Sequence, residues 1–477
     1  MDKFSRVPMA SLPASTQSSS SSLESLPVEI QVHILGSLPD VKTLGSLLRA
    51  SPQYLQVYQD VREDAISQIV CNQITPAILP LAINVLQQSY LRSHLRPRSK
   101  VLEFLETFKE PQSILPQTTF SLEISKKLLK IHYIVEYFAD VFITDRLNRL
   151  SKYIPQIAPL LVDANASLGI LGIEHHRLTR AFYHLELYGS LFYDPEIADD
   201  VIAVQEQSSL FLAKLPGWET EEFLCVHEYL LDSLSGYLDQ VEEDFIQDYV
   251  EDGPPTDIAK NPYDMRFNHD DEYWYFFSMD GQDARIQNRW MEGSLTRGLK
   301  TLQDILESHT ADERYDSLGD LTIDRPRNTI KQALDALPCL RDQPEVSRCK
   351  IATRINSLES PNDAWPWALK KWAHPRKGGL RSHSSTHQQY NALRGWGYLI
   401  WSDETLGILG LLEKRQSTDW TYKEKTAVIH SYRAEDLTGR FGNQERRGTA
   451  VEVRTRSQYE LWRKEALEAV QSSGSID

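Results

Sequence analysis

Residues 25–38 read SLPVEIQVHILGSL, and this stretch decides how the N-terminal part of the chain folds. Ile30, Ile34 and Leu38 recur every four residues, so they lie on one face of a predicted helix. The stretch directly follows a serine-rich leader, residues 1–22, whose polar composition predicts disorder. An apolar helix behind such a leader is either a core helix or a helix that is held ready for another protein.

Two more short helices are predicted directly after the first. The second helix presents Leu44, Leu47 and Leu48 on one face. The third presents Tyr54 and Val57 in the same way. Ser25 is placed to cap the first helix, and Asp40 is placed to cap the second. Pro39 is predicted to end the first helix, and Pro52 is predicted to end the second.

The composition is that of a folded, acidic protein. The chain has 477 residues, 41 % of them hydrophobic, and a formal net charge of −16. Its length predicts roughly two to three domains at ~150 residues each, with enough apolar residues for a sizeable core. The acidic balance argues against binding to nucleic acid or to a membrane surface, because such proteins usually carry net positive charge. We therefore expect neither nucleic acid nor membrane among the partners.

The cysteines and the hydropathy pattern indicate the compartment. Cys71, Cys225, Cys339 and Cys349 are scattered and form no CxxC pair, which is typical of free thiols in a reducing compartment. The sequence shows neither the apolar core of a secretory signal nor an apolar run long enough to span a bilayer. We therefore expect a cytoplasmic and/or nuclear protein.

The pattern along the chain predicts a mainly α fold, in which a short three-helix unit precedes a large irregular α-helical domain. The unit and the helices that follow it occupy residues 23–95, and the large domain occupies residues 99–421. This domain contains an acidic loop at 239–273 and a loop rich in tryptophan and basic residues at 365–389. A charged C-terminal tail, residues 422–477, contains one more predicted helix.

The sequence contains no recognisable catalytic or metal-binding motif. Gly-rich phosphate loops, the GxSxG nucleophile turn and the HExxH helix are all absent. His175 and His176 are adjacent rather than four residues apart, so they do not converge on one metal ion. The segment 174–188 is better explained as a core helix, whose apolar face comprises Leu178, Ala181, Phe182, Leu185 and Tyr188. In the absence of a motif for catalysis or metal binding, we expect no enzyme activity, no cofactor and no metal.

Two charged segments have both a structural and a functional interpretation. Glu219, Glu221 and Glu222 stand in the first turns of a predicted helix, where the helix dipole favours carboxylates, so they are capping candidates. The loop after residue 364 can grip an anionic or phosphorylated peptide, or it can be a solvated loop pinned by its tryptophans. The candidate substrate-contacting residues are Trp365, Trp367, Lys370, Lys371 and Trp372.

The first two predicted helices together resemble an F-box. In that family the pattern LPxEIxxxILxxL is followed by a short turn and by a second helix of the form LxxLxx(V/A)S. The first part is filled here by Leu26, Pro27, Glu29, Ile30, Ile34, Leu35 and Leu38. The second part is filled by Leu44, Leu47, Ala50 and Ser51. The resemblance covers about residues 23–62.

The resemblance implies a role in ubiquitin conjugation. F-box proteins dock through this unit on the Skp-family adaptor of an SCF (cullin–RING) ubiquitin ligase, and the rest of the chain holds a protein substrate. The substrate is not identified by the sequence. The residues that the resemblance places in the adaptor contact are Leu26, Pro27, Glu29, Ile30, Ile34 and Leu35, supported by Leu44 and Leu47.

Three further stretches resemble motifs of filamentous-fungal F-box-like proteins with a helical C-terminal region. These are RLTRAFYHLELYGSLF (177–192), WETEEFLCVHEYL (218–230) and LRGWGYLIWSDETL (393–406). An alternative function is a non-catalytic helical scaffold whose F-box-like helices pack intramolecularly. A third, a metal-dependent hydrolase, rests only on scattered His and Asp.

Overall fold

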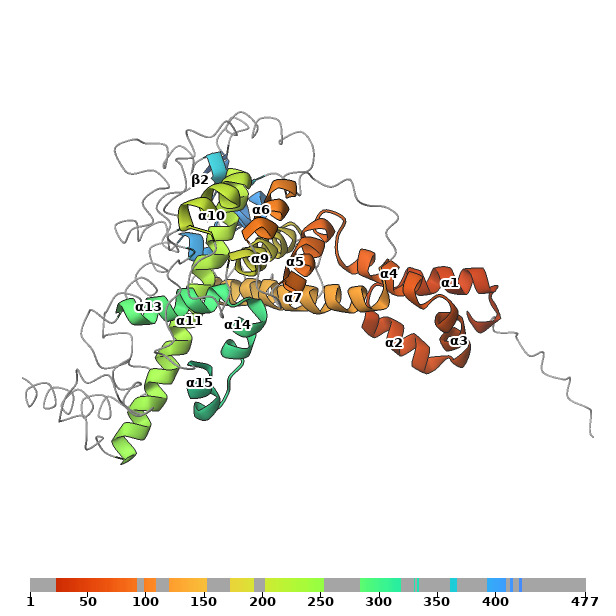
Figure 1. The fold of residues 1–477 in the computed structure, drawn as a ribbon, viewed down its shortest axis with the longest axis horizontal. Helices are drawn as coiled ribbons and strands as arrows, with labels where there is room; N and C mark the ends of the chain where they lie inside the picture. The colour runs from red at the N-terminus through yellow and green to blue at the C-terminus, as the bar shows by residue number, and fades with distance from the viewer. Residues whose placement is uncertain are drawn as a thin grey trace, which may run out of the picture. The chain divides into compact units, whose positions relative to one another are not determined.

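The chain is mainly α-helical, as the helical spacing predicted, and forms two compact units (Figure 1). The first unit is Met1–Pro76 with Ile114–Leu129, and the second is Ala77–Ser113 with Lys130–Asp477. The first segment of the first unit ends at Pro76, whereas the predicted N-terminal division, which included the helices after the three-helix unit, ran to residue 95. The computed structural model describes residues 23–91, 98–108, 120–151, 172–192, 202–252, 284–318, 330, 333, 361–366, 393–408, 412–414 and 420–422.

The first unit contains the three predicted helices and a fourth helix after them. Asp40 caps the second helix by accepting a hydrogen bond from the Thr43 N–H at 2.6 Å. Ser51 caps the third by accepting from the Tyr54 N–H at 3.3 Å, and Pro52 takes the first helical position. The elements are η1 (Leu23–Ser25), α1 (Val28–Gly36), α2 (Val41–Ala50), α3 (Pro52–Asp60), α4 (Arg62–Gln73) and the first residues of α7 (Leu122–Ser151).

Side-chain hydrogen bonds and a small apolar core hold these helices together. The C-terminal end of α1 is tied to α4, because the side-chain amide of Asn72 donates to the carbonyls of Gly36 at 2.8 Å and Leu38 at 2.9 Å. The bond to Gly36 satisfies a carbonyl that the end of a helix leaves without an intrahelical partner, and the bond to Leu38 holds the residues that follow the helix. The core consists of Leu35, Leu44, Tyr54, Val57, Ala65, Ile66 and Ile69.

The beginning of α1 differs from the prediction. Ser25 was expected to cap this helix, but it belongs to η1, and α1 begins at Val28 with Pro27 in the N-cap position. Pro27 has no side-chain group that can cap the helix, so the first turn of α1 is held by other contacts.

Replacing Asp40 with Ala is expected to destabilise α2 by about 1 kcal/mol, because the cap of the Thr43 N–H is lost. The same hydrogen bond lowers the pKa of Asp40, so its stabilising effect is present above the unfolded pKa and is lost on acidification. Hydrogen exchange of the α2 amides should become about five times faster. Asp40→Asn is the control, since Asn caps equally well; equal exchange in the Ala variant and the wild type would refute the cap.

The second unit is larger and is organised around α9 (Gly172–Phe192). Both α5 and α11 pack against α9, and every residue from His176 to Leu185 is buried. The predicted apolar face of this helix is therefore confirmed as core. The other elements are α5 (Leu79–Leu91), α6 (Arg98–Thr107), the rest of α7, α10 (Val204–Leu210), η3 (Leu212–Lys214), α11 (Gly217–Asp252), α13 (Ala284–Thr296), α14 (Leu299–Leu306), α15 (Ala311–Leu318), α20 (Asp403–Ile408), β1 (Leu412–Lys414) and β2 (Trp420–Tyr422).

Two features of the second unit depart from the prediction. The acidic segment 239–273 was predicted as a loop, but its first part continues α11 as far as Asp252. The acidic side chains there did not end the helix because they occur at helix-compatible spacing between apolar residues such as Val241. The strands β1 and β2 pair antiparallel and were not predicted. The rest of the acidic segment and the tail, residues 422–477 beyond Tyr422, lie outside the described residues.

Among the described residues, no helix has the length and apolar character needed to cross a membrane.

Candidate functional site

Helix α1 has one buried and one exposed face. Leu35 and Gln31, four residues apart, are both fully buried. Ile30 is 47 % exposed and shares the other face with the half-buried Ile34, and the exposed Pro27, three residues before Ile30, extends it. We call Pro27, Ile30 and Ile34 the α1 face. The helix therefore contributes to its own core and still presents apolar side chains outward.

The predicted adaptor-binding residues divide between this surface and the core. Leu35 and Leu44 lie in the core, so they support the fold and do not present a surface for direct contact, contrary to the expectation for Leu35. Leu35 is buried where α1 packs against α3 and α4, and Leu44 is buried on α2, which packs against α3. Pro27, Glu29 and Ile30 are exposed, and Leu26, Ile34 and Leu47 are half-buried.

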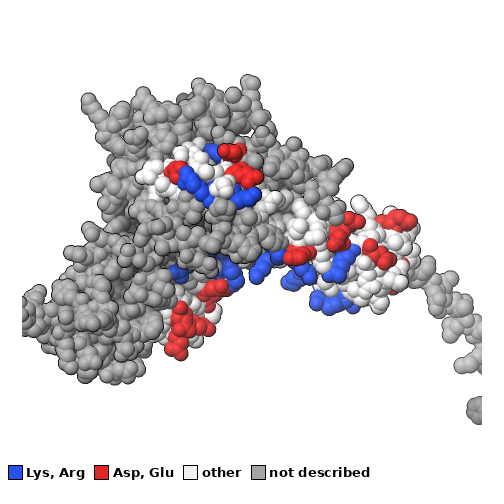
Figure 2. Space-filling model, in the orientation of Figure 1, with Lys and Arg blue, Asp and Glu red and all other residues white. Residues whose placement is uncertain are grey.

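Exposed apolar side chains are concentrated in this part of the first unit. Of the eight large apolar side chains exposed in the described residues, Leu23, Val28, Ile30 and Leu55 lie between residues 23 and 55. In the view of Figure 2, the visible surface of the first unit is largely uncharged, with acidic and basic side chains between the uncharged areas. Glu29 is the only Asp, Glu, Lys or Arg in residues 26–39. Such a surface is typical of a protein–protein contact.

Side chains from α1 and α3 hold the residues just before α1, residues 23–27, which we call the entry turn. The Gln31 side-chain amide donates to the carbonyls of Glu24 at 3.0 Å and Leu26 at 2.9 Å. The Ser51 hydroxyl donates to the Glu24 carboxylate, and the Tyr54 hydroxyl donates to the Leu23 carbonyl at 3.5 Å. The sequence prediction missed these contacts. The signal that was present is a glutamine four residues before Leu35, on the face of the helix that carries this apolar side chain.

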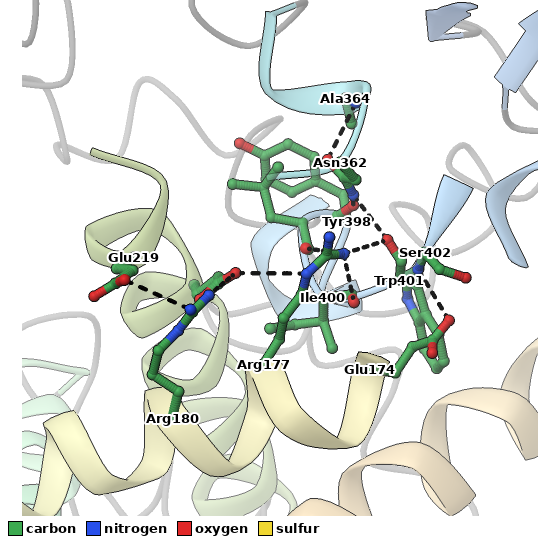
Figure 3. A network of polar contacts seen from close by, with 12 residues as sticks. Glu174, Arg177, Arg180, Glu219, Asn362, Ala364, Tyr398, Ile400, Trp401 and Ser402 are labelled. Carbon is green, nitrogen blue, oxygen red and sulfur yellow. Dashed lines mark hydrogen bonds and ion pairs between the residues drawn. The ribbon is translucent and has the colours of Figure 1, made fainter. Parts of the chain in front are cut away.

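A second cluster of polar residues lies inside the second unit (Figure 3). Arg177 of α9 donates to three successive carbonyls, those of Leu399, Ile400 and Trp401, at 3.3, 3.2 and 3.1 Å. The turn that presents these carbonyls passes through Gly397 at φ 78°, a conformation that favours glycine. The guanidinium thus fastens residues 397–401 to α9.

Two buried ion pairs join α11 to its neighbours. Arg180 of α9 pairs with Glu222, with Nη2 and Oε2 2.6 Å apart. Arg394 pairs with Glu221 through Nε and Oε1 at 2.6 Å, and the Tyr398 hydroxyl donates to the same oxygen at 3.1 Å. Glu221 and Glu222 were predicted as capping candidates and are instead buried ion-pair partners. The prediction failed because both partners lie far away in the sequence.

Two more contacts complete this network. Glu174 accepts from the Ser402 N–H at 2.9 Å and from the Thr405 hydroxyl at 2.6 Å. Asn362 donates to the carbonyls of Tyr398 at 2.8 Å and Trp401 at 2.9 Å. The three sequence motifs at 177–192, 218–230 and 393–406 thus meet in one buried network. Because its charged groups are paired with each other and buried, the network's evident effect is to hold these segments together.

The histidines of the second unit are strongly influenced by their surroundings. Burial and the charge of Arg180 lower the pKa of His176 to about 4 and that of His184 to about 3. Burial opposes the charged form of His227, but Glu292 and Glu228 outweigh it and raise its pKa to about 9.

His175 shows the opposite balance to its neighbour His176. Burial again opposes the charged form, but hydrogen bonds to Asp140 and Glu136 raise the pKa of His175 to about 10. Its Nε2 lies 3.1 Å from the Glu136 carboxylate and 3.6 Å from that of Asp140. Across the ranges that the structure describes, no three His, Cys, Asp or Glu side chains are grouped so that they could hold a metal ion.

The predicted substrate-contacting residues fall mostly outside the described residues, which include Trp365 but not Trp367, Lys370, Lys371 or Trp372. Trp365 lies in a short helical turn and is only 3 % exposed, so it does not offer the surface contact expected of it. The backbone N–H of Trp365 donates to the Asn362 carbonyl at 3.1 Å and closes this turn. The large, mainly apolar indole is a core side chain here.

Comparison with known proteins adds no family: no protein-family model, no curated protein and no solved structure matches the chain.

Proposed function

We propose that the chain is an F-box-like substrate-recognition adaptor, which docks on a Skp-family subunit of an SCF ubiquitin ligase through its first unit. The second unit would hold a protein substrate. Such a protein acts by position, because it raises the effective concentration of a substrate lysine near the ubiquitin-loaded enzyme. The proposal rests on the F-box-like sequence of residues 23–62 and on the surface described above.

The observation that carries the proposal is the exposure of Ile30. Isoleucine is among the residue types most often buried in a core, and Leu35 of the same helix is fully buried. Ile30 instead stays 47 % exposed beside Pro27. Among residues 26–39 around it, Glu29 is the only Asp, Glu, Lys or Arg. Covering such side chains with a partner gains roughly 25 cal/mol for each Å² of apolar surface buried.

The alternative, a helical scaffold with an intramolecular role for these helices, draws on the burial of Leu35 and Leu44. These side chains complete a core within the first unit. The α1 face takes no part in that core beyond Ile34. The two functions therefore differ in what Ile30 does: the adaptor function requires that a second protein covers it.

Replacing Ile30 with Asp is expected to weaken binding to a purified fungal Skp-family adaptor about 30-fold, about 2 kcal/mol, because a carboxylate in the contact would lose hydration without gaining a partner. Isothermal titration with the full-length protein measures this change. The matched control is Ile408→Asp, an isoleucine of the second unit that is 42 % exposed. We expect this variant to bind like the wild type.

The outcomes separate the functions. Binding by the wild type and the control, with loss in Ile30→Asp and unchanged circular dichroism, supports the adaptor function. No binding by the wild type would overturn it and would favour the scaffold. Equal binding by Ile30→Asp and the wild type would show that the adaptor contact lies elsewhere.

A further inference from the structure

We propose that Gln31 is a positioning residue for docking: its side-chain amide holds the entry turn against α1, so that Pro27 and Ile30 form one surface. The inference rests on the proposed function of the first unit. It goes beyond the F-box-like pattern, in which the residue after Ile30 is an unspecified position.

The placement of Gln31 is unusual for a glutamine. The side chain is fully buried, and both of its amide hydrogens are directed at the entry turn, to Glu24 O at 3.0 Å and Leu26 O at 2.9 Å. Burying an amide in a core costs free energy unless hydrogen bonds replace its hydration. An apolar residue would fill this site, four residues before Leu35, at lower cost. The amide therefore serves the turn rather than the core.

The entry turn joins α1 at Pro27, whose carbonyl accepts from the N–H groups of Ile30 at 3.0 Å and Gln31 at 3.1 Å, and the Gln31 side-chain amide adds a contact at the preceding residue, Leu26. Pro27 is the N-cap of α1 and makes no side-chain cap. Within the turn, the Leu26 N–H reaches the Leu23 carbonyl only at 3.4 Å. Ser51 and Tyr54 hold the turn at Glu24 and Leu23, which are its first residues. Gln31 alone among these side chains reaches Leu26, the residue next to Pro27.

The position of Pro27 matters for docking because a mobile turn must be ordered when a partner binds. Ordering a residue costs conformational entropy, which is subtracted from the binding free energy. With Gln31 in place, the turn is already ordered against the helix that carries Ile30. The amide thus acts on docking through Pro27, without being part of the surface that a partner touches.

The test compares Gln31→Met with the wild type in the full-length protein. Methionine has nearly the shape of glutamine but no donor, so it fills the site and releases the turn. The released carbonyls belong to Glu24, which is exposed, and Leu26, which is half-buried, and water can hydrate them. A merely structural role would lower stability and affinity together, whereas a positioning role lowers affinity alone. Gln56→Met, on the exposed side of α3, is the matched control.

Three measurements are made on each protein. Nitrogen-15 relaxation after selective leucine labelling gives the order parameters of Leu23 and Leu26. Hydrogen exchange of the α4 amides gives the stability of the first unit, and titration with a purified fungal Skp-family adaptor gives the affinity. For Gln31→Met we expect the Leu26 order parameter to fall from about 0.85 to below about 0.6. We also expect at least about tenfold weaker binding with α4 exchange unchanged, and wild-type behaviour of Gln56→Met.

Each other result overturns a stated part. Unchanged Leu26 order in Gln31→Met refutes positioning, and so does a loss of affinity matched by faster α4 exchange. A lowered Leu26 order parameter in Gln31→Met with unchanged affinity refutes the link to docking. If the wild type does not bind the adaptor, the proposed function fails, and so does the docking role of Gln31, while the Leu26 order parameter still decides whether the amide holds the turn.

Discussion

Replacing Glu221 with Gln is expected to destabilise the second unit by about 3–5 kcal/mol. Glu221 and Arg394 are almost fully buried, and Arg394 Nε lies 2.6 Å from the carboxylate. Removing the negative charge takes from the buried guanidinium the carboxylate with which it pairs, and Glu228 remains as a further carboxylate that acts on it. Because arginine does not release its proton in proteins, it cannot escape the cost by becoming neutral. The effect should exceed that of an ordinary core substitution.

Urea unfolding followed by tryptophan fluorescence measures this loss selectively. All ten tryptophans lie after residue 217, so the signal reports the second unit. The matched control is Asp304→Asn, which removes the exposed ion pair with Lys300 and should cost less than about 0.5 kcal/mol. The double variant Glu221→Leu/Arg394→Met should recover much of the loss, because it leaves neither charge buried alone. A Glu221→Gln variant as stable as the control would mean that the pair is not buried in solution.

Acidification from pH 6.5 to pH 4 is expected to cost the second unit about 3 kcal/mol through His184. Its folded pKa, about 3, lies below the unfolded value of 6.5, so the neutral ring stabilises the fold above pH 6.5. This contribution is lost as the pH falls, at about 1.4 kcal/mol for each pH unit. His227 has the opposite sign: its pKa of about 9 makes its contribution full below pH 6.5 and lost as the pH rises through 9. Stability should therefore be greatest near pH 6.5.

The variant His184→Phe tests the acidic limb. Phenylalanine takes up no proton and keeps the edge-on contact with Phe211, whose ring centroid lies 6.4 Å from that of His184. Urea unfolding between pH 4 and pH 8 should show a dependence flatter by about 3 kcal/mol than in the wild type. His309→Gln, at an exposed histidine of the same unit, should leave the profile unchanged. An unaltered acidic limb in His184→Phe would assign the acid sensitivity to other groups.

Much of the first unit could be predicted from its sequence because the forces that begin and end its helices act over a few residues. Asp40 caps the helix that directly follows it, as predicted, and Pro52 lies directly beyond the end of α2, which it was predicted to break. The same holds for α9, whose apolar spacing was enough to predict a core helix. The prediction failed at Ser25, because a local capping residue was overridden by the long-range contacts of the entry turn.

The sequence by itself determined the mainly α class, the F-box-like pattern of residues 26–51 and the helices that carry it. Only the tertiary structure decided which side of α1 is core, that Gln31 supports the entry turn and that Glu221 pairs with Arg394. The last two residues are 173 positions apart. Helix periodicity shows which side chains share a face, but the side that is buried depends on neighbouring helices. Charge pairing depends on distance in space, and no local pattern encodes a partner so far along the chain.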